Sequence, residues 1–247
     1  MHRAVRNGEI HSFAGFLRQL SRFATPLVSP IKYFSLIALI SGSKSCAVLN
    51  PSMPPSTPPP HPESIRLQVA ILACTSFDSS WNGDAYRVVA VSRANESNLL
   101  SGEGSRIWGG RWNPPDTPPT CYFALDYATA MEEALAQNRK QGLPDARALP
   151  LVTTATSLTL RRTLNLAEKQ VSDILGVSIE RMIVEPHDDP GSESISQAIG
   201  RIAWAVCYQA LLVPSAAKRS SRNLVVFPNK LTSGHMEIMN PHLLPKL

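Results

Sequence analysis

Seven of the twelve residues at positions 51–62 are prolines, and this run constrains the fold more than any other stretch of the chain. Proline has a fixed φ and no backbone N–H, so the run can form neither a helix interior nor a central strand. We therefore interpret residues 51–64 as a Pro-rich linker. It separates residues 1–50 from one domain at residues 65–247, which is long enough to bury a sizeable core.

Residues 1–50 form a basic leader that we interpret as disordered or as a targeting segment. They hold six Lys and Arg against one acid, Glu9, whereas residues 51–247 hold 18 basic and 18 acidic residues. A nucleic-acid-binding protein carries its basic surplus on the folded domain, so no direct nucleic-acid binding is expected. The leader fits a weak secretory signal, an amphipathic targeting segment, or a stretch that precedes a translation start at Met53.

The apolar run of the leader, residues 33–40, is too short to cross a bilayer, which needs about 20 residues, so no membrane span is expected. The four cysteines, Cys46, Cys74, Cys121 and Cys207, lie far apart, with no C-x-x-C pair and no histidine at ligand spacing. This pattern indicates free thiols in a reducing compartment, hence a cytoplasmic location, and it predicts no zinc site.

Hydrophobic periodicity and turn residues predict a mixture of helices and short strands without regular alternation, which is the α+β class. We expect strands at residues 86–91, 121–125, 148–160, 210–213 and 224–227. We expect helices at residues 65–74, 127–140, 167–175 and 195–206. Asp126 is the expected N-cap of the second helix, and residues 81–84 and 186–194 are expected to be irregular.

Residues 101–113 combine four glycines, two arginines and two tryptophans. Glycine lets a ligand approach the main chain, and a guanidinium offers a planar charged fork that suits phosphate. The segment therefore predicts a loop that holds an anionic molecule with flat rings. The alternative is a Gly-rich turn with Arg106 and Arg111 in solvent, and with Trp108 and Trp112 in the core or supporting the loop.

Several motifs accompany this loop in a fixed order along the chain. They are Tyr86-Arg87-Val88, Ser101-Gly102-Glu103-Gly104-Ser105-Arg106, Gly109-Gly110-Arg111-Trp112-Asn113-Pro114, Tyr122, Ala130-Met131-Glu132-Glu133, Val213-Pro214-Ser215-Ala216 and Asn223-Leu224-Val225-Val226-Phe227. With them, the chain from about Tyr86 to Leu231 resembles the RES domain, a family named for an arginine, a glutamate and a serine. Residues 65–247 are accordingly interpreted as a RES-like catalytic domain.

The resemblance implies an ADP-ribosyltransferase-like fold of mixed sheets with flanking helices. It implies an enzyme of the NAD phosphorylase or NAD glycohydrolase kind, which splits the nicotinamide–ribose bond with phosphate or water as acceptor. NAD is then a substrate, and no separate cofactor or metal is expected. Members of the family are typically toxins of bacterial toxin–antitoxin pairs, so the resemblance also implies a cognate antitoxin protein as partner.

Carried over by position, the resemblance implies three catalytic residues, Arg111, Glu133 and Ser215. It implies three substrate-binding residues, Arg87, Tyr122 and Asn223. Arginines suit the pyrophosphate of NAD, and a carboxylate stabilises the positive charge that develops on the ribose when nicotinamide leaves.

Ser215 is expected to donate a hydrogen bond to the ligand rather than to attack it, because no histidine stands at a spacing that would activate it. Tyr122 is expected to stack on, or hydrogen-bond to, the nicotinamide half.

Other interpretations stay open from the sequence. Glu133 is alternatively a solvated helix residue, with Glu132 as the true carboxylate, and Ser215 is alternatively only a turn residue. The protein is alternatively a transferase that attaches ADP-ribose to a macromolecule, or a non-catalytic nucleotide-binding module. Every proposed site residue follows position 62, so a chain that starts near Glu63 is expected to fold and to cleave NAD.

Overall fold

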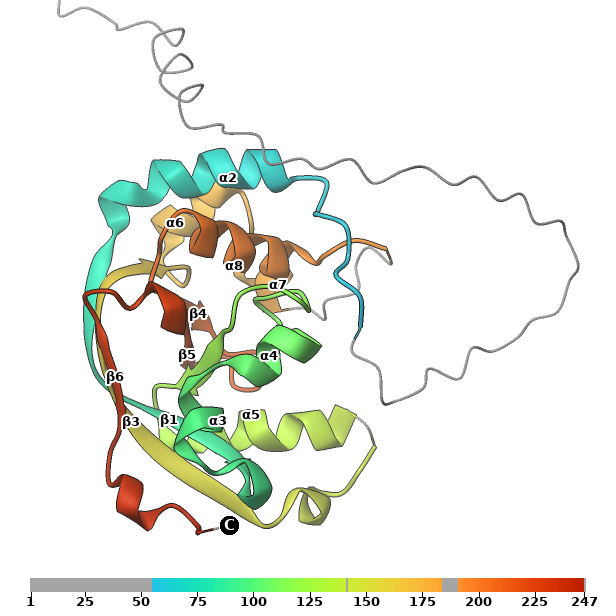
Figure 1. The fold of residues 1–247 in the computed structure, drawn as a ribbon. Helices are drawn as coiled ribbons and strands as arrows, with labels where there is room; N and C mark the ends of the chain where they lie inside the picture. Colours follow the sequence, from blue (N-terminus) through green and yellow to red (C-terminus); the bar gives the residue numbers. More distant parts are fainter. Residues whose placement is uncertain (1–54, 141, 184–190, 247) are drawn as a thin grey trace, which may run out of the picture. The chain divides into compact units, whose positions relative to one another are not determined.

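The computed structural model describes residues 55–140, 142–183 and 191–246, all of which belong to one unit, Asn50–Leu247. The basic leader and most of the loop expected at residues 186–194 lie outside the described residues. The helices are α2 (Ser64–Ala73), α3 (Glu96–Leu100), α4 (Glu103–Trp108), α5 (Tyr127–Lys140), α6 (Lys169–Leu175), α7 (Ile179–Ile183) and α8 (Ile195–Ala205) (Figure 1). The strands are β1 (Ser79–Ala90), β2 (Cys121–Ala124), β3 (Leu151–Asn165), β4 (Ala210–Pro214), β5 (Arg222–Val226) and β6 (His235–Ile238).

The six strands form one sheet in the order β1-β2-β5-β4-β3-β6, and a further pairing joins β1 to β3. Because β1 pairs with both β2 and β3, five of the strands close into a ring, and β6 extends the ring at β3. The antiparallel ladder of β1 and β3 runs from Ser79↔Thr163 to Ala90↔Leu151. Only β3 and β4 pair in parallel among the described strands. The mixed α+β class predicted from the sequence is confirmed.

Strands β4 and β5 are buried on both faces, which is why the sequence shows them as short, nearly continuous apolar runs. Leu211 and Val225 belong to a core that includes residues of α2, α6 and α8. Their neighbours Leu212 and Leu224 belong to a second core, with Phe123 of β2. Successive residues of a strand point to opposite faces, so each strand serves both cores.

Helices α2, α6 and α8 gather beside one end of the sheet, whereas α5 packs against β1 and β2 (Figure 1). Helix α8 begins with a capping box, in which Ser194 and Gln197 each bond to the backbone of the other. Helix α5 begins after Asp126, whose Oδ1 accepts a 2.8 Å hydrogen bond from Thr129 N. These contacts confirm the predicted helices and the predicted cap.

Two local expectations were wrong, and three elements were not predicted. Residues 81–84 do not interrupt the chain but lie within β1, where Asn82 pairs with Thr159 and Asp84 with Ser157. Pairing with a long neighbouring strand overrides the turn preference of Asn and Gly. Residues 101–113 are not one loop, because helix α4 occupies their first half. Strand β6 and helices α3 and α7 were not predicted from the sequence.

The end of the Pro-rich segment contacts the domain. The carbonyl oxygen of Pro59 accepts a 2.8 Å hydrogen bond from Glu193 N, and His61 N donates a 3.0 Å bond to Glu193 Oε1. We call residues 59–63 the strap. Residues 59–61 of the strap belong to no helix or strand, in keeping with their prolines, and residues 62–63 form a turn that leads into α2.

The cysteines of the described chain agree with the sequence: Cys74 and Cys121 are buried, Cys207 is exposed, and all three are free thiols. Burial raises the pKa of the Cys121 thiol to about 11. No described helix is long and apolar enough to cross a membrane.

Candidate active site

A pocket of about 350 Å³ lies where β1, β2, β5 and α5 meet the loop that follows α4. Its lining includes five of the six site residues expected from the sequence: Arg87, Arg111, Tyr122, Glu133 and Asn223. The sixth, Ser215, lies directly behind Glu133. Residues that are up to 136 positions apart in the sequence are thus brought to one place.

The carboxylate of Glu133 is held through one of its oxygens. Oε1 accepts hydrogen bonds of 2.6 Å from Ser215 Oγ and 2.6 Å from Asn223 Nδ2, and a longer one of 3.5 Å from Ala217 N. No described residue hydrogen-bonds to Oε2. The carboxylate is therefore oriented by the protein on one side and keeps its second oxygen for a ligand.

Ser215 is fully buried, and its hydroxyl is engaged within the protein. Oγ donates to Glu133 and accepts a 3.1 Å hydrogen bond from Lys218 N, in the turn after β4. The sequence predicted that this hydroxyl donates a hydrogen bond to the ligand, whereas in the structure it donates its hydrogen bond to Glu133. Ser215 thus acts on the pocket by orienting the carboxylate.

Glu132, the alternative carboxylate, has a different environment. Its Oε2 accepts a 2.7 Å bond from Arg139, which also pairs with Asp145 on the surface of α5. The side chain is 44% exposed and does not line the pocket. The geometry therefore favours Glu133 over its neighbour.

Two arginines bring positive charge to the pocket. Arg87 on β1 donates from its terminal nitrogen to the carbonyl oxygen of Leu99. Arg111 donates a 2.8 Å bond to the carbonyl oxygen of Ile183 at the end of α7. These bonds fix the direction of each guanidinium against a backbone carbonyl oxygen. Arg106 pairs with Glu103 and with Asp116, and it does not line the pocket.

The hydroxyl of Tyr122 supports the loop at residues 109–113. It donates a 2.6 Å bond to Asn113 Oδ1 and accepts a 3.0 Å bond from Trp112 N. Burial raises the pKa of Tyr122 above its usual value. A Cβ at Gly110 would overlap this hydroxyl, so the close approach requires glycine. With its proton committed to Asn113, Tyr122 offers the pocket mainly its ring.

The two tryptophans of the Gly-rich segment differ. Trp112 is 2% exposed and belongs to the core shared with α8, as the sequence indicated. Trp108, at the end of α4, is 50% exposed and is not a core residue.

The pocket is also lined by residues that were not predicted to be catalytic or substrate-binding, although several of them belong to the motifs: Tyr86, Val88, Gly109, Gly110, Phe123, Ala124, Ala130 and Ala134. Most of these residues adjoin a predicted site residue in the chain, which is a signal that could have found them. Ala130 lies one helical turn before Glu133, where a small side chain leaves room in front of the carboxylate. No described residues form a cluster of His, Cys, Asp or Glu that could hold a metal ion.

This fold and this arrangement of arginines, glutamate and serine define a member of the RES domain family, and the chain belongs to it. The profile of the RES domain matches residues 84–243, close to the span expected from the motifs. The NAD(+) phosphorylase MbcT of Mycobacterium tuberculosis (strain ATCC 25618 / H37Rv) is 30% identical to the chain over 138 residues, which are 55% of this chain and 69% of the relative. MbcT of Mycobacterium bovis is similar to the same extent.

A solved structure is similar as well, the crystal structure of the M. tuberculosis MbcT–MbcA toxin–antitoxin complex. The TM-score is 0.56 at 26% sequence identity, and the match covers 72% of this chain and 94% of the other.

Proposed function

We propose that this protein degrades NAD by cleaving the bond between nicotinamide and ribose with inorganic phosphate as acceptor. The observation that carries the proposal is the carboxylate of Glu133, fixed by Ser215 and Asn223 in a pocket that also contains two arginines. The similarity to proteins named NAD(+) phosphorylase supports the same reaction.

The charges of the pocket are complementary to the charges of the substrate and to the charge that develops during the reaction. The C–N bond to the ribose breaks, and its electron pair neutralises the pyridinium as nicotinamide leaves. The ribose carbon becomes positively charged, and a carboxylate that is already oriented stabilises it without reorganisation. Glu133 supplies this carboxylate, while Arg87 and Arg111 supply donors for the pyrophosphate.

Phosphate then forms a bond to the ribose carbon through one of its oxygens and loses a proton to solvent. The products are nicotinamide and ADP-ribose that carries the new phosphate. NAD is consumed as substrate, so the reaction requires no separate cofactor, and the proposal includes no metal.

The proposal extends to the setting of the enzyme. We assign it an ADP-ribosyltransferase-like arrangement, because Arg87 on β1 and Glu133 on α5, which packs against β1, line one pocket. We further assign it the role of a cytoplasmic toxin with a cognate antitoxin protein, which the likeness to a toxin–antitoxin complex supports.

The experiment incubates the purified full chain with NAD in buffer with phosphate and in buffer without it, and identifies the products by mass spectrometry. We expect nicotinamide and phosphorylated ADP-ribose, with faster turnover when phosphate is present. Free ADP-ribose as the main product in both buffers would replace phosphate by water as the acceptor. NAD that stays intact in both buffers would contradict the proposal.

A further inference from the structure

The loop at residues 109–113 places Arg111 in the lining of the pocket, and helix α8 contacts the backbone of this loop. Gln197 Nε2 donates a 3.0 Å hydrogen bond to the carbonyl oxygen of Gly110. One turn further along the same face of α8, a Cβ at Gly200 would overlap the carbonyl oxygen of Trp112. The backbone on both sides of Arg111 is therefore in contact with α8.

The guanidinium of Arg111 is also connected to the first turn of α8, through hydrogen bonds to α7. It donates to the carbonyl oxygen of Ile183 on α7, and Ser196 Oγ donates a 2.8 Å bond to the carbonyl oxygen of Met182, the preceding residue of α7. Ser196 is 3% exposed. The first turn of α8 thus supports the backbone of Arg111 through Gln197 and its side chain through α7.

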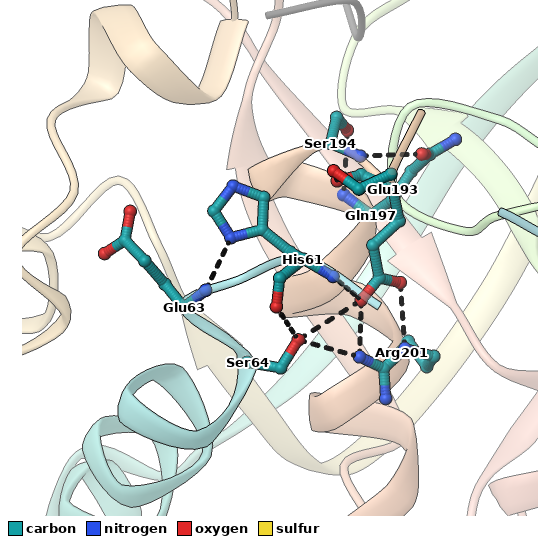
Figure 2. A network of polar contacts seen from close by, with 8 residues as sticks. His61, Glu63, Ser64, Glu193, Ser194, Gln197 and Arg201 are labelled. Carbon is teal, nitrogen blue, oxygen red and sulfur yellow. Dashed lines mark hydrogen bonds and ion pairs between the residues drawn. The ribbon is translucent and has the colours of Figure 1, made fainter. Parts of the chain in front are cut away.

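The strap fixes this first turn in place, and Figure 2 shows the network. The side chain of Glu193 is 1% exposed, just before the helix, and it pairs with Arg201. Its Oε1 also accepts hydrogen bonds from His61 N, at 3.0 Å, and from Ser64 Oγ, at 3.4 Å. Residues that precede the matched RES domain therefore contact the helix end that supports Arg111.

We propose that Gln197 is a positioning residue of the active site, which holds the loop so that Arg111 meets the pyrophosphate of NAD, and that the strap keeps Gln197 in place. The inference rests on the proposed cleavage of NAD. Gln197 itself does not line the pocket, so its effect on the ligand passes through Gly110 and Arg111.

The oxygen and the nitrogen of the Gln197 side-chain amide have different partners, so substitutions can separate their roles. Oε1 completes the capping box by accepting a 3.0 Å bond from Ser194 N, whereas Nε2 holds Gly110. Gln197→Glu keeps the capping acceptor, which is favourable at this helix position, and removes the donor to Gly110. Gln197→Met removes the donor without adding a charge. Gln170→Glu, on the exposed face of α6, is the matched control for the charge.

The first measurement is steady-state kinetics of NAD cleavage, together with thermal unfolding. We expect the KM for NAD to rise roughly three- to tenfold in both Gln197 variants, the range that one hydrogen bond contributes, while kcat changes less. Gln197→Glu should unfold within about 5 °C of the control, the shift that one lost hydrogen bond produces in a domain of this size. A KM equal to that of Gln170→Glu would overturn the proposal, and so would a rise in Gln197→Glu that Gln197→Met does not share.

The second measurement is amide hydrogen exchange at residues 109–113 without ligand, which does not depend on the reaction. We expect faster exchange there in both Gln197 variants and unchanged exchange in Gln170→Glu. If the wild-type chain does not act on NAD, the proposed function fails, and this measurement alone decides whether Gln197 holds the loop. Exchange that matches the wild-type chain would overturn the positioning role.

Discussion

Ser215 Oγ donates a 2.6 Å hydrogen bond to Oε1 of Glu133, a residue 82 positions earlier in the chain. The bond links the end of β4 to the middle of α5, and its Ser215 end is fully buried. It sets the direction of the carboxylate before any substrate arrives. Preorganisation of this kind is a main source of electrostatic catalysis.

Ser215→Ala should lower kcat for NAD cleavage by about tenfold or more, because Glu133 then keeps only Asn223 as a close donor. The free energy of unfolding should fall by about 1 to 2 kcal/mol, since Lys218 N also loses its acceptor. The control is Ser220→Ala in the exposed turn nearby. Equal rates in the two variants would show that Ser215 is only a turn residue.

Arg111→Lys should raise the KM for NAD by about tenfold, because an ammonium cannot bond to the carbonyl oxygen of Ile183 and to a phosphate with the planar fork of a guanidinium. Arg106→Lys is a matched control five residues earlier, where the guanidinium pairs with Glu103 and Asp116 on the surface. Calorimetric titration of NAD into each variant measures the difference. Wild-type affinity in Arg111→Lys would remove this residue from the site.

Asp126 should make the stability of the domain depend on pH. Hydrogen bonds from the side chain and backbone of Thr129, with Lys218 nearby, hold the pKa of this carboxyl below its usual value. Its contribution is therefore present above the pKa of an unfolded Asp, about 4, and is lost as the pH falls through the lower folded-state pKa.

Asp126→Ala should cost about 1 kcal/mol of unfolding free energy at pH 7, the usual value for an N-cap. The difference from wild type should shrink below pH of about 4, and denaturant unfolding at several pH values measures it. A difference that stays constant down to pH of about 2 would mean that the ionised carboxylate is not what stabilises the start of α5.

The strap refines the expectation that residues 1–62 are dispensable. A chain that starts at Pro55 keeps the bonds of Pro59 and His61 to Glu193, whereas a chain that starts at Glu63 loses both. We expect the shorter chain to lose about 1 to 2 kcal/mol of unfolding free energy and to show a higher KM for NAD. Equal kinetics and stability for the two chains would show that the strap is dispensable and that the domain begins near Glu63, as the sequence predicted.

Local patterns in the sequence predicted a helix or strand correctly where the element's own residues determine it. The repeat of Ile195, Ile199 and Ile202 marks α8 as a buried helix, and Asp126 marks the start of α5. The apolar runs of β4 and β5 mark strands that are buried on both faces. The motif order also predicted five of the residues that line the pocket.

Long-range partners were not visible in the sequence. Residues 81–84 join β1 because the long strand β3 pairs with them. The sequence around Gly83 gives no sign of this pairing. The donor to Gly110 is Gln197, 87 positions later, and no spacing rule connects the two. The hydroxyl of Ser215 was expected to face the ligand because the sequence does not reveal its contact with Glu133.

The central claim is that the carboxylate of Glu133 drives cleavage of NAD, and a pair of isosteric variants tests it most directly. Glu133→Gln keeps an oxygen that accepts from Ser215 and Asn223 but removes the negative charge, whereas Glu132→Gln removes a charge that pairs with Arg139 on the surface. The measurement is the rate of nicotinamide release from NAD in phosphate buffer, with thermal unfolding to confirm the fold. We predict that Glu133→Gln loses at least about a hundredfold in kcat and Glu132→Gln keeps the wild-type rate. Full activity in Glu133→Gln, or loss of activity in Glu132→Gln instead, would contradict the account.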